Sequence, residues 1–236
     1  MYTRVSKKFQ ISLFSALCLS FLSVSGTVVA LEEDSALYNA YSHHCKSVSD
    51  INEHVPVLYQ YAKECSSVTE IGVRSVVSTW GILLGLSESS SSEKKYLGID
   101  LHSPPEDKFQ LAKKLSQENE VEFDFLTAND LDIELEPVDM LFIDSLHTYC
   151  HLTYELETFS PNVQKYICMH DTSAPWGNCD DSSYSGNYSE YPAHYDRSKR
   201  GLWPAVSDFL ERHPEWRLLE RRTNNHGFTI LERIPE

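Results

Sequence analysis

Carboxylate and imidazole side chains stand where two predicted buried strands end. Asp144 follows the apolar run 138–143, and His170 and Asp171 follow the apolar run 166–169. Because the carboxyl ends of neighbouring parallel strands meet at one sheet edge, with the strands about 4.8 Å apart, we expect Asp144 and Asp171 to lie together. Two carboxylates at that separation repel each other unless a cation or a proton lies between them. The sequence therefore predicts a divalent metal site at this edge.

The ligand set decides which metal fits such a site. Mg²⁺ prefers oxygen ligands and keeps water-filled positions where a substrate hydroxyl could bind. The imidazole of His170 would shift the preference toward Mn²⁺, Fe²⁺ or Zn²⁺. His147, one helical turn beyond Asp144, is placed to remove the proton from a hydroxyl that the metal acidifies. The alternative is that Asp144 caps the following helix and that His147 is only its hydrogen-bonded neighbour.

Two earlier strands end in residues that suit a nucleotide-like ligand. Glu70 and Gly72 close the predicted strand 68–73, and Asp100 closes the predicted strand 96–100. A glycine where a strand turns into a helix lets the backbone approach a ligand, and the Glu70 carboxylate could accept from an amino group or a hydroxyl. Asp100 is placed to accept from both hydroxyls of a ribose. Alternatively, Gly72 only forms a turn and Asp100 is a helix cap or a solvated loop residue.

The elements that must position these residues alternate between strands and helices. Strands are predicted over 68–73, 96–100, 121–126, 138–143 and 166–169, and helices over 75–86, 106–119, 151–159 and 202–212. This alternation predicts a parallel sheet covered by helices on both faces. Two further strands, 216–221 and 228–232, are joined by a hairpin turn. One or two helices are expected between Glu32 and Cys65, before this core.

The order and spacing of these motifs resemble class I S-adenosylmethionine-dependent methyltransferases. The resemblance covers residues 66–234 and includes the terminal hairpin. It rests on Glu-Ile-Gly at 70–72, Gly-Ile-Asp at 98–100 and the acidic strand end at 138–144.

A narrower resemblance connects the later motifs to a metal-dependent branch of that family, which includes macrolide-sugar O-methyltransferases and cephalosporin-hydroxylase-like proteins. The motifs are Ile-Asp-x-x-His-x-Tyr at 143–149 and Met-His-Asp-Thr at 169–172. The chain departs from the branch at His170, where an acidic residue is usual. It also has fewer glycines than the family after the first strand, with Ser75 and Ser78 where further small residues are expected. The cofactor loop is therefore expected to differ in shape.

The resemblance implies a fold, a cofactor and a reaction. The fold is a Rossmann-like α/β domain with a seven-stranded, mostly parallel sheet, a C-terminal antiparallel hairpin and helices on both faces. The reaction is methyl transfer from S-adenosylmethionine to an oxygen of a small-molecule acceptor, such as a sugar or a natural product, assisted by a divalent metal such as Mg²⁺ or Mn²⁺. The residues implied to hold the cofactor are Glu70, Gly72, Asp100, Thr127, Asn129 and Asp144. The implied metal ligands are Asp144, His170 and Asp171. His147 is the implied catalytic base.

Two other functions compete with this one. The first is an exported cofactor-fold binding protein without methyltransferase activity, because S-adenosylmethionine is chiefly cytosolic. The second is a nicotinamide-dependent oxidoreductase, which shares the acidic strand end but requires a Gly-x-Gly-x-x-Gly turn that this sequence lacks. The net charge of −15 argues against a nucleic-acid partner, because phosphate binding needs a basic face.

The first thirty residues differ from the rest of the chain. Basic residues precede an uncharged apolar run over 11–30, which ends at 28–30 in the small residues that a signal peptidase reads. We expect residues 1–30 to be a cleaved signal peptide or else a membrane anchor. Either would place the folded part in the secretory pathway, in the periplasm or outside the cell.

The remainder is predicted to comprise an N-terminal helical extension, 31–65, and a methyltransferase domain, 66–236, with an inserted loop at 172–200. Beyond Cys18 the chain has five cysteines, an odd number, so at least one thiol stays free or pairs with another chain. Aromatic residues on the inserted loop are expected to form a lid that grips the acceptor, or else an ordered surface loop. They are Trp176, Tyr184, Tyr188, Tyr191, His194 and Tyr195.

Overall fold

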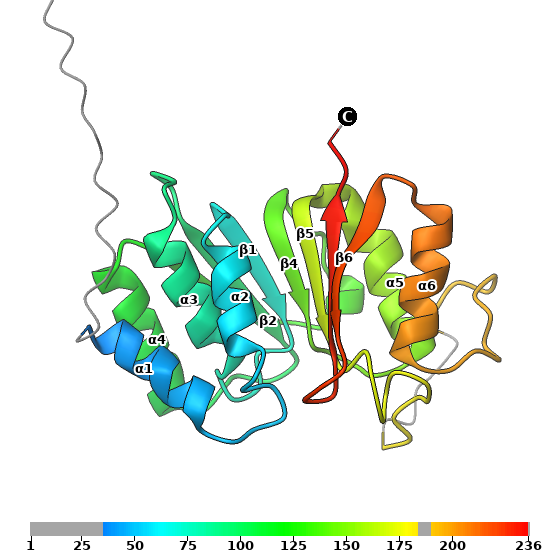
Figure 1. Ribbon diagram of the computed structural model, residues 1–236, viewed down its shortest axis with the longest axis horizontal. Coiled ribbons are helices and arrows are strands. Elements are labelled where there is room, and N and C mark those ends of the chain that lie inside the picture. Colours follow the sequence, from blue (N-terminus) through cyan, green and yellow to red (C-terminus); the bar gives the residue numbers. More distant parts are fainter. Residues whose placement is uncertain (1–34, 184–189, 236) are drawn as a thin grey trace, which may run out of the picture.

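The computed structural model describes residues 35–183 and 190–235, and within them one mixed sheet forms the centre of the molecule (Figure 1). Its seven strands lie in the order β3-β2-β1-β4-β5-β7-β6. The strands are β1 Ser67–Ile71, β2 Lys95–Asp100, β3 Glu122–Thr127, β4 Val138–Ile143, β5 Val163–His170, β6 Trp216–Arg222 and β7 Phe228–Arg233. The first five run parallel, and β7 runs antiparallel to both β5 and β6. The predicted Rossmann-like sheet with a terminal hairpin is confirmed.

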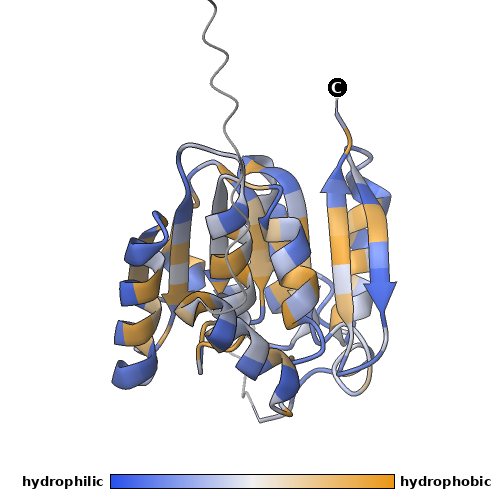
Figure 2. Cartoon of the chain, turned by 60° about the vertical axis from the view of Figure 1, so that its left-hand side comes forward, coloured by the Kyte–Doolittle hydropathy of each residue, from blue (hydrophilic) through white to orange (hydrophobic). Residues whose placement is uncertain are grey.

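Helices cover both faces of this sheet. They are α1 Ala36–Lys46, α2 Val55–Ala62, α3 Ser78–Glu88, α4 Glu106–Glu118, α5 Tyr149–Phe159 and α6 Leu202–Arg212, with short 3₁₀ turns η1 Asp130–Asp132 and η2 Ser160–Asn162. One layer of buried side chains joins α1–α4 to the sheet, and a second joins α5 and α6 to the opposite face. Alternate residues of β4 serve the two layers, Met140 and Phe142 the first, Leu141 and Ile143 the second. Figure 2 shows the apolar residues gathered on the strands and on the helix faces that meet them.

One difference from the prediction lies at the start of α3. The sequence suggests a helix from residue 75, yet α3 begins at Ser78. The backbone before it takes left-handed conformations at Gly72, Arg74 and Val76, with φ values of 91°, 43° and 60°. A right-handed helix cannot include such residues, so the helix starts only after them.

The two N-terminal helices pack against α3. Leu37 of α1 and Leu58 of α2 are fully buried in the same core layer as β1. The loop between α1 and α2 also contacts the turn between β6 and β7, where the Asn225 side-chain amide donates to the backbone oxygen of Ser49 at 3.0 Å. The helices expected between Glu32 and Cys65 are therefore two, and they share a core with the sheet.

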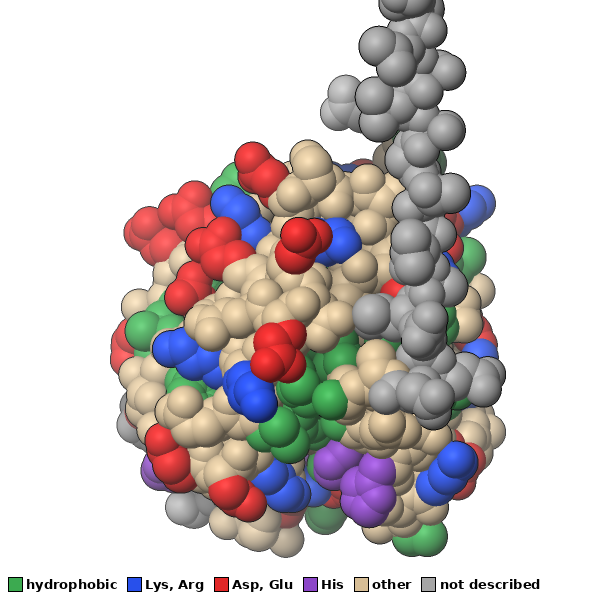
Figure 3. Space-filling model, turned by 90° about the vertical axis from the view of Figure 1, so that its left-hand side faces the viewer, with side chains coloured by type: hydrophobic (Ala, Val, Ile, Leu, Met, Phe, Trp, Pro, Cys, Tyr) green, Lys and Arg blue, Asp and Glu red, His purple; other side chains and the backbone are tan. Residues whose placement is uncertain are grey.

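Several sequence predictions concern residues outside the described part of the chain. The predicted signal peptide or anchor, 1–30, lies there, as do Tyr184 and Tyr188 of the predicted lid. In residues 35–183 and 190–235, no helix has the length and the apolar character needed to cross a bilayer. The five cysteines in that part are free thiols. On the face shown in Figure 3, acidic and basic side chains are interspersed among neutral and apolar ones.

Candidate functional site

A pocket of about 450 Å³ opens at the carboxyl ends of the central strands. The strand order turns at this place, since β1 leads to β2 and β3 on one side and to β4 on the other. Open α/β sheets bind ligands in such a crevice. Its volume lies in the range of about 300–1,000 Å³ that is usual for small-molecule and cofactor sites. Of the predicted cofactor residues, four line it: Gly72, Asp100, Asn129 and Asp144.

Gly72 occupies a position that only glycine can take. Its φ is +91°, and a Cβ placed there would lie 2.0 Å from the backbone oxygen of Asp144. The Gly72 amide donates to the backbone oxygen of Ile99 at 2.9 Å. The glycine therefore lets the ends of β1, β2 and β4 approach one another closely.

The turn that follows Gly72 has an unusual composition for its shape. Left-handed conformations recur at every second residue, at Arg74 and Val76, where glycine would be the ordinary choice. The small residues Ser75 and Ser78, singled out from the sequence, are not at the left-handed positions. The loop therefore adopts left-handed conformations at residues that carry side chains. One of these side chains, the Arg74 guanidinium, pairs with Asp50 at 2.6 Å.

Asp100 fixes the shape of this turn while facing the pocket. Its Oδ2 accepts from the backbone N–H of Arg74 at 2.8 Å, and its Oδ1 accepts from the backbone N–H of His102 at 3.0 Å. A carboxylate offers about four lone-pair sites, so each oxygen can accept once more. Asp100 can therefore also receive the hydroxyls of a bound ligand.

Glu70 does not line the pocket, although the sequence predicts that its carboxylate holds the cofactor. Its side chain is fully buried. It accepts from the hydroxyls of Tyr96 at 2.5 Å and Thr79 at 2.8 Å, and also from Ser78. Successive side chains of a strand point to opposite faces, so Ile71 lines the pocket and Glu70 turns away from it. Burial raises the pKa of Glu70 to about 7, although the three hydroxyls oppose the shift.

The segment after β3 lies partly as predicted. Asn129 lines the pocket, and its Oδ1 accepts from the backbone N–H of Leu131 at 3.3 Å, which caps η1. Thr127, also predicted to lie near the cofactor, is exposed and is not among the residues that line the pocket. Its Oγ1 lies 3.4 Å from the hydroxyl of Ser103.

The three predicted metal ligands come together beside the pocket. One ligand atom each of Asp144, His170 and Asp171 lies within 4.8 Å of the other two. The His170 Nδ1 atom is 3.3 Å from Asp144 Oδ1 and 3.2 Å from Asp171 Oδ2. The pairing of β4 with β5 places Ile143 opposite Met169, so the residues that follow each strand meet. Two carboxylates and one imidazole therefore converge, as the sequence predicts.

The orientation of His170 suits a metal ligand. Its Nε2 lies 3.0 Å from the backbone oxygen of Asn225, to which it can donate only as N–H. This contact leaves Nδ1 directed at Asp144 and Asp171, where it can hold either a proton or a metal ion. Burial lowers the pKa of His170, but the charge of Asp144 and hydrogen bonds to both carboxylates raise it well above its usual value. Without a metal, a protonated imidazole supplies the positive charge that the two carboxylates require.

The turn between β6 and β7 adds a histidine that sequence reasoning missed. His226 Nδ1 lies 3.1 Å from Asp171 Oδ1, and the His226 ring is stacked on the His170 ring with centroids 6.2 Å apart. Asp171 itself has a left-handed φ of 59° directly after β5. The only sequence signal for His226 is its place in the hairpin turn, and its partner is fifty-five residues away.

His147 lies against both carboxylates. Its Nε2 is 3.0 Å from Asp171 Oδ2 and 3.6 Å from Asp144 Oδ1, and its Nδ1 is 3.9 Å from Asp181 Oδ2. Burial lowers the pKa of His147, but the contacts with Asp144 and Asp171 outweigh burial and raise the pKa to about 9. In the metal-free protein His147 is therefore protonated at neutral pH. It lies where the sequence places a base, but it can accept a proton only after this pKa falls.

Comparison with known proteins supports the architecture. No family model matches the sequence, and no curated protein matches it. Among solved structures, the O-methyltransferase TomG from Streptomyces achromogenes, which is involved in tomaymycin synthesis and was solved with S-adenosylmethionine, is 16% identical over 88% of this chain and 93% of its own, with a TM-score of 0.52. An O-methyltransferase from Bacillus cereus in complex with S-adenosylhomocysteine is 16% identical over 87% and 93%, with a TM-score of 0.50. A methyltransferase from Geobacter sulfurreducens is 15% identical over 87% and 91%, with a TM-score of 0.50.

The chain has the class I methyltransferase fold. The likeness extends over more than four-fifths of the chain, so it includes the N-terminal helices or the inserted loop as well as the sheet. In this fold the pocket of about 450 Å³ lies at the strand-order reversal, and the carboxylate cluster lies beside it.

The inserted loop folds onto the site in its described part. The Asp181 amide donates to the backbone oxygen of His147 at 2.9 Å, and Trp176 stacks on the His147 ring with centroids 6.0 Å apart. Tyr191 is buried and lines the pocket. The rings of His194 and Tyr195 contact each other, with centroids 4.9 Å apart, and neither residue lines the pocket. Two of the predicted lid residues thus reach the site.

Sequence reasoning also missed a second polar cluster on the wall of the pocket. Asp130 and His151 line the pocket, and Glu155 lies within ligand distance of both. The signal was present, because His151 and Glu155 are four residues apart and so share one face of α5.

Proposed function

We propose that this chain binds S-adenosylmethionine in the pocket and transfers its methyl group to an oxygen of a small molecule. The observation that carries the proposal is that Gly72, Asp100 and Asp144 meet at the carboxyl ends of three adjacent strands. The fold is shared with solved methyltransferases, two of which are described as O-methyltransferases in complex with S-adenosylmethionine or S-adenosylhomocysteine.

The chain's own residues divide the task of holding the cofactor. Asp100 would accept from the ribose hydroxyls with the lone pairs that Arg74 and His102 leave free. Gly72 would bring the backbone close to the ligand, and Asn129 would lie toward the adenine. Methyl transfer forms a bond from the acceptor oxygen to the methyl carbon as the carbon–sulfur bond breaks, so the alignment of the two reactants supplies much of the catalysis.

A divalent metal fits the residues beside the pocket. Asp144, His170 and Asp171 would hold it, because Nδ1 of His170 is directed at both carboxylates while Nε2 is engaged by Asn225. The imidazole favours Mn²⁺ over Mg²⁺. When bound, such an ion would lower the pKa of an acceptor hydroxyl.

His147 would take the proton of the acceptor hydroxyl at Nε2. Its present pKa of about 9 reflects two neighbouring carboxylates that favour the imidazolium form. A positive charge bound between Asp144 and Asp171 would favour the neutral form instead. Trp176 lies against the His147 ring and would hold it in place beside the acceptor.

Calorimetry with S-adenosylhomocysteine tests the cofactor part of the proposal. We expect wild-type protein to bind S-adenosylhomocysteine. Asp100→Asn should raise the Kd about 10- to 100-fold, the usual cost of losing a charged hydrogen bond. The matched control is Asp107→Asn, an exposed carboxylate in the first turn of α4, which should bind like wild type. A folded wild-type protein that does not bind would contradict the proposal.

Transfer itself is measured as S-adenosylhomocysteine released with a panel of hydroxylated small molecules. We expect release with Mn²⁺ and little release with a chelator. Cofactor binding without release on any acceptor, with or without Mn²⁺, would favour a binding protein without methyltransferase activity.

A further inference from the structure

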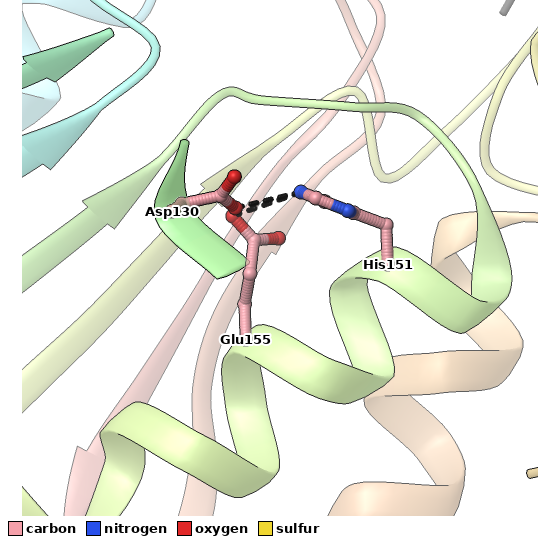
Figure 4. Close-up of side chains that lie close together, drawn as sticks. All are labelled: Asp130, His151 and Glu155. Carbon is pink, nitrogen blue, oxygen red and sulfur yellow. Dashed lines mark ion pairs between the residues drawn. The ribbon is translucent and has the colours of Figure 1, made fainter. Parts of the chain in front are cut away.

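Three acidic and imidazole side chains converge on one point at the wall of the pocket (Figure 4). Asp130 comes from η1, and His151 and Glu155 come from one face of α5. The side chains are 91%, 95% and fully buried, respectively. This Asp130–His151–Glu155 cluster shares no residue with the Asp144–His170–Asp171 cluster.

One buried atom of each residue in this cluster lacks a hydrogen-bond partner in the described chain. Asp130 Oδ2, His151 Nε2 and Glu155 Oε2 are each buried, and none makes a hydrogen bond within the described chain. The Asp130 Oδ2 and His151 Nε2 atoms form an ion pair at 2.7 Å, without the geometry of a hydrogen bond. Buried polar atoms are nearly always hydrogen-bonded, so three buried atoms that face one another without hydrogen bonds point to a missing partner. Because two of the three residues are carboxylates, that partner should be positive.

The distances suit a small divalent ion. Zn²⁺ takes nitrogen and oxygen ligands at about 2.0–2.1 Å in a tetrahedron, which places ligand atoms about 3.3 Å apart. The separations from His151 Nε2 are 2.7 Å to Asp130 Oδ2 and 3.7 Å to Glu155 Oε1. Shifts of about half an ångström would therefore bring these ligands to the spacing that Zn²⁺ requires.

Surrounding residues orient two of the three ligands. The hydroxyl of Tyr191 lies 2.9 Å from His151 Nδ1, so it can accept the Nδ1 proton and leave the Nε2 lone pair toward the carboxylates. The hydroxyl of Ser145 donates to Glu155 Oε1 at 2.7 Å. Outer contacts of this kind are typical of metal-binding histidines and carboxylates.

We propose that Asp130, His151 and Glu155 bind a Zn²⁺-like divalent ion, whose fourth position faces the pocket. Asp130 and His151 both line that pocket, so water or a bound ligand can complete the coordination. The ion would join η1 to α5 and hold Tyr191 of the inserted loop against this wall. The proposal is independent of methyl transfer, since it rests only on residues that the proposed reaction does not use.

The test is the number of Zn²⁺ ions bound per chain, measured by equilibrium dialysis and metal analysis on the purified full chain. Glu155→Gln keeps the shape of the side chain and an acceptor for Ser145, but removes a charged ligand. We expect it to bind one Zn²⁺ fewer than wild type. Glu157→Gln removes a carboxylate that lies on α5 like Glu155 but pairs with Arg212 of α6, and this variant should bind as many Zn²⁺ ions as wild type. Asp130→Asn serves as a second ligand variant if Glu155→Gln does not fold.

Asp171→Asn separates this site from the proposed catalytic metal. A Zn²⁺ ion lost in Glu155→Gln and kept in Asp171→Asn supports the present proposal, even if the other cluster binds nothing. Equal Zn²⁺ content in wild type, Glu155→Gln and Asp130→Asn, all folded, would overturn it.

Tyr191→Phe tests whether the Tyr191 hydroxyl orients His151 for metal binding. Co²⁺ bound at the site should show visible absorption bands, and titration of these bands gives its Kd. We expect Tyr191→Phe to raise this Kd about 10- to 100-fold. An unchanged Kd would contradict the role of Tyr191 in orienting His151.

Discussion

Replacing Glu70 with glutamine should remove a pH dependence from the stability of the fold. Glu70 is fully buried, and its pKa is raised from 4.5 to about 7, mainly by burial. Because the folded pKa lies above the unfolded one, the stabilising contribution is complete below about pH 4.5 and is lost as pH rises through about 7. Between about pH 5 and about pH 8, this single group should lower the free energy of unfolding by about 2–3 kcal/mol.

Urea unfolding of wild type and Glu70→Gln at these two pH values measures the effect. The difference in unfolding free energy between the two proteins should shift by about 2–3 kcal/mol in favour of Glu70→Gln as pH rises. The change with pH is the quantity to compare, since glutamine also alters the hydrogen bonds from Tyr96, Thr79 and Ser78. The exposed strand carboxylate in Glu122→Gln is the control and should follow wild type. If wild type and Glu70→Gln kept a constant difference, the account of Glu70 as a buried, proton-binding residue would be wrong.

Three further predictions address the site. Gly72→Ala should destabilise the protein by about 2–4 kcal/mol, because the Cβ of alanine would overlap the Asp144 carbonyl and the backbone there is left-handed. Thermal melting measures this loss. An unchanged melting temperature would mean that β1 and β4 do not approach as described. Asp171→Asn should abolish stimulation of methyl transfer by Mn²⁺ while S-adenosylhomocysteine binds with nearly the wild-type Kd, and a full Mn²⁺ response would rule out the ligand role. His147→Ala should lower turnover about 10²- to 10⁴-fold with the cofactor Kd unchanged, and turnover at the wild-type rate across the pH range would exclude a general base at this position.

Much of the fold follows from the sequence because strand ends and helix periodicity are local signals. The apolar run 138–143 is β4 without any shift, and the convergence of Asp144 with Asp171 follows from the parallel pairing of β4 and β5. The same reasoning placed Gly72 and Asp100 at the pocket.

The features that the sequence does not reveal have long-range causes. Glu70 looks like a ligand-binding acid in sequence, but the Tyr96 hydroxyl that satisfies it comes from the next strand, twenty-six residues away. The left-handed backbone at Arg74 and Val76 contradicts the preference of those residue types, so no local pattern predicts it. The position of His226 beside Asp171 depends on how the terminal hairpin pairs with β5, and no local sequence pattern predicts that pairing.

The contacts of the hairpin turn connect the N-terminal helices to the predicted metal ligands. The loop between α1 and α2 contacts this turn at two points. The backbone oxygen of Ser49 accepts from the Asn225 side chain, and the Nε2 atom of His54 lies 3.0 Å from the backbone oxygen of Asn224. The neighbouring carbonyl of Asn225 orients His170. A chain that begins after α2 would therefore keep every proposed metal ligand but would lose the contacts of Ser49 and His54 with this turn. On the proposed function, such a truncated protein should bind metal more weakly than the full chain.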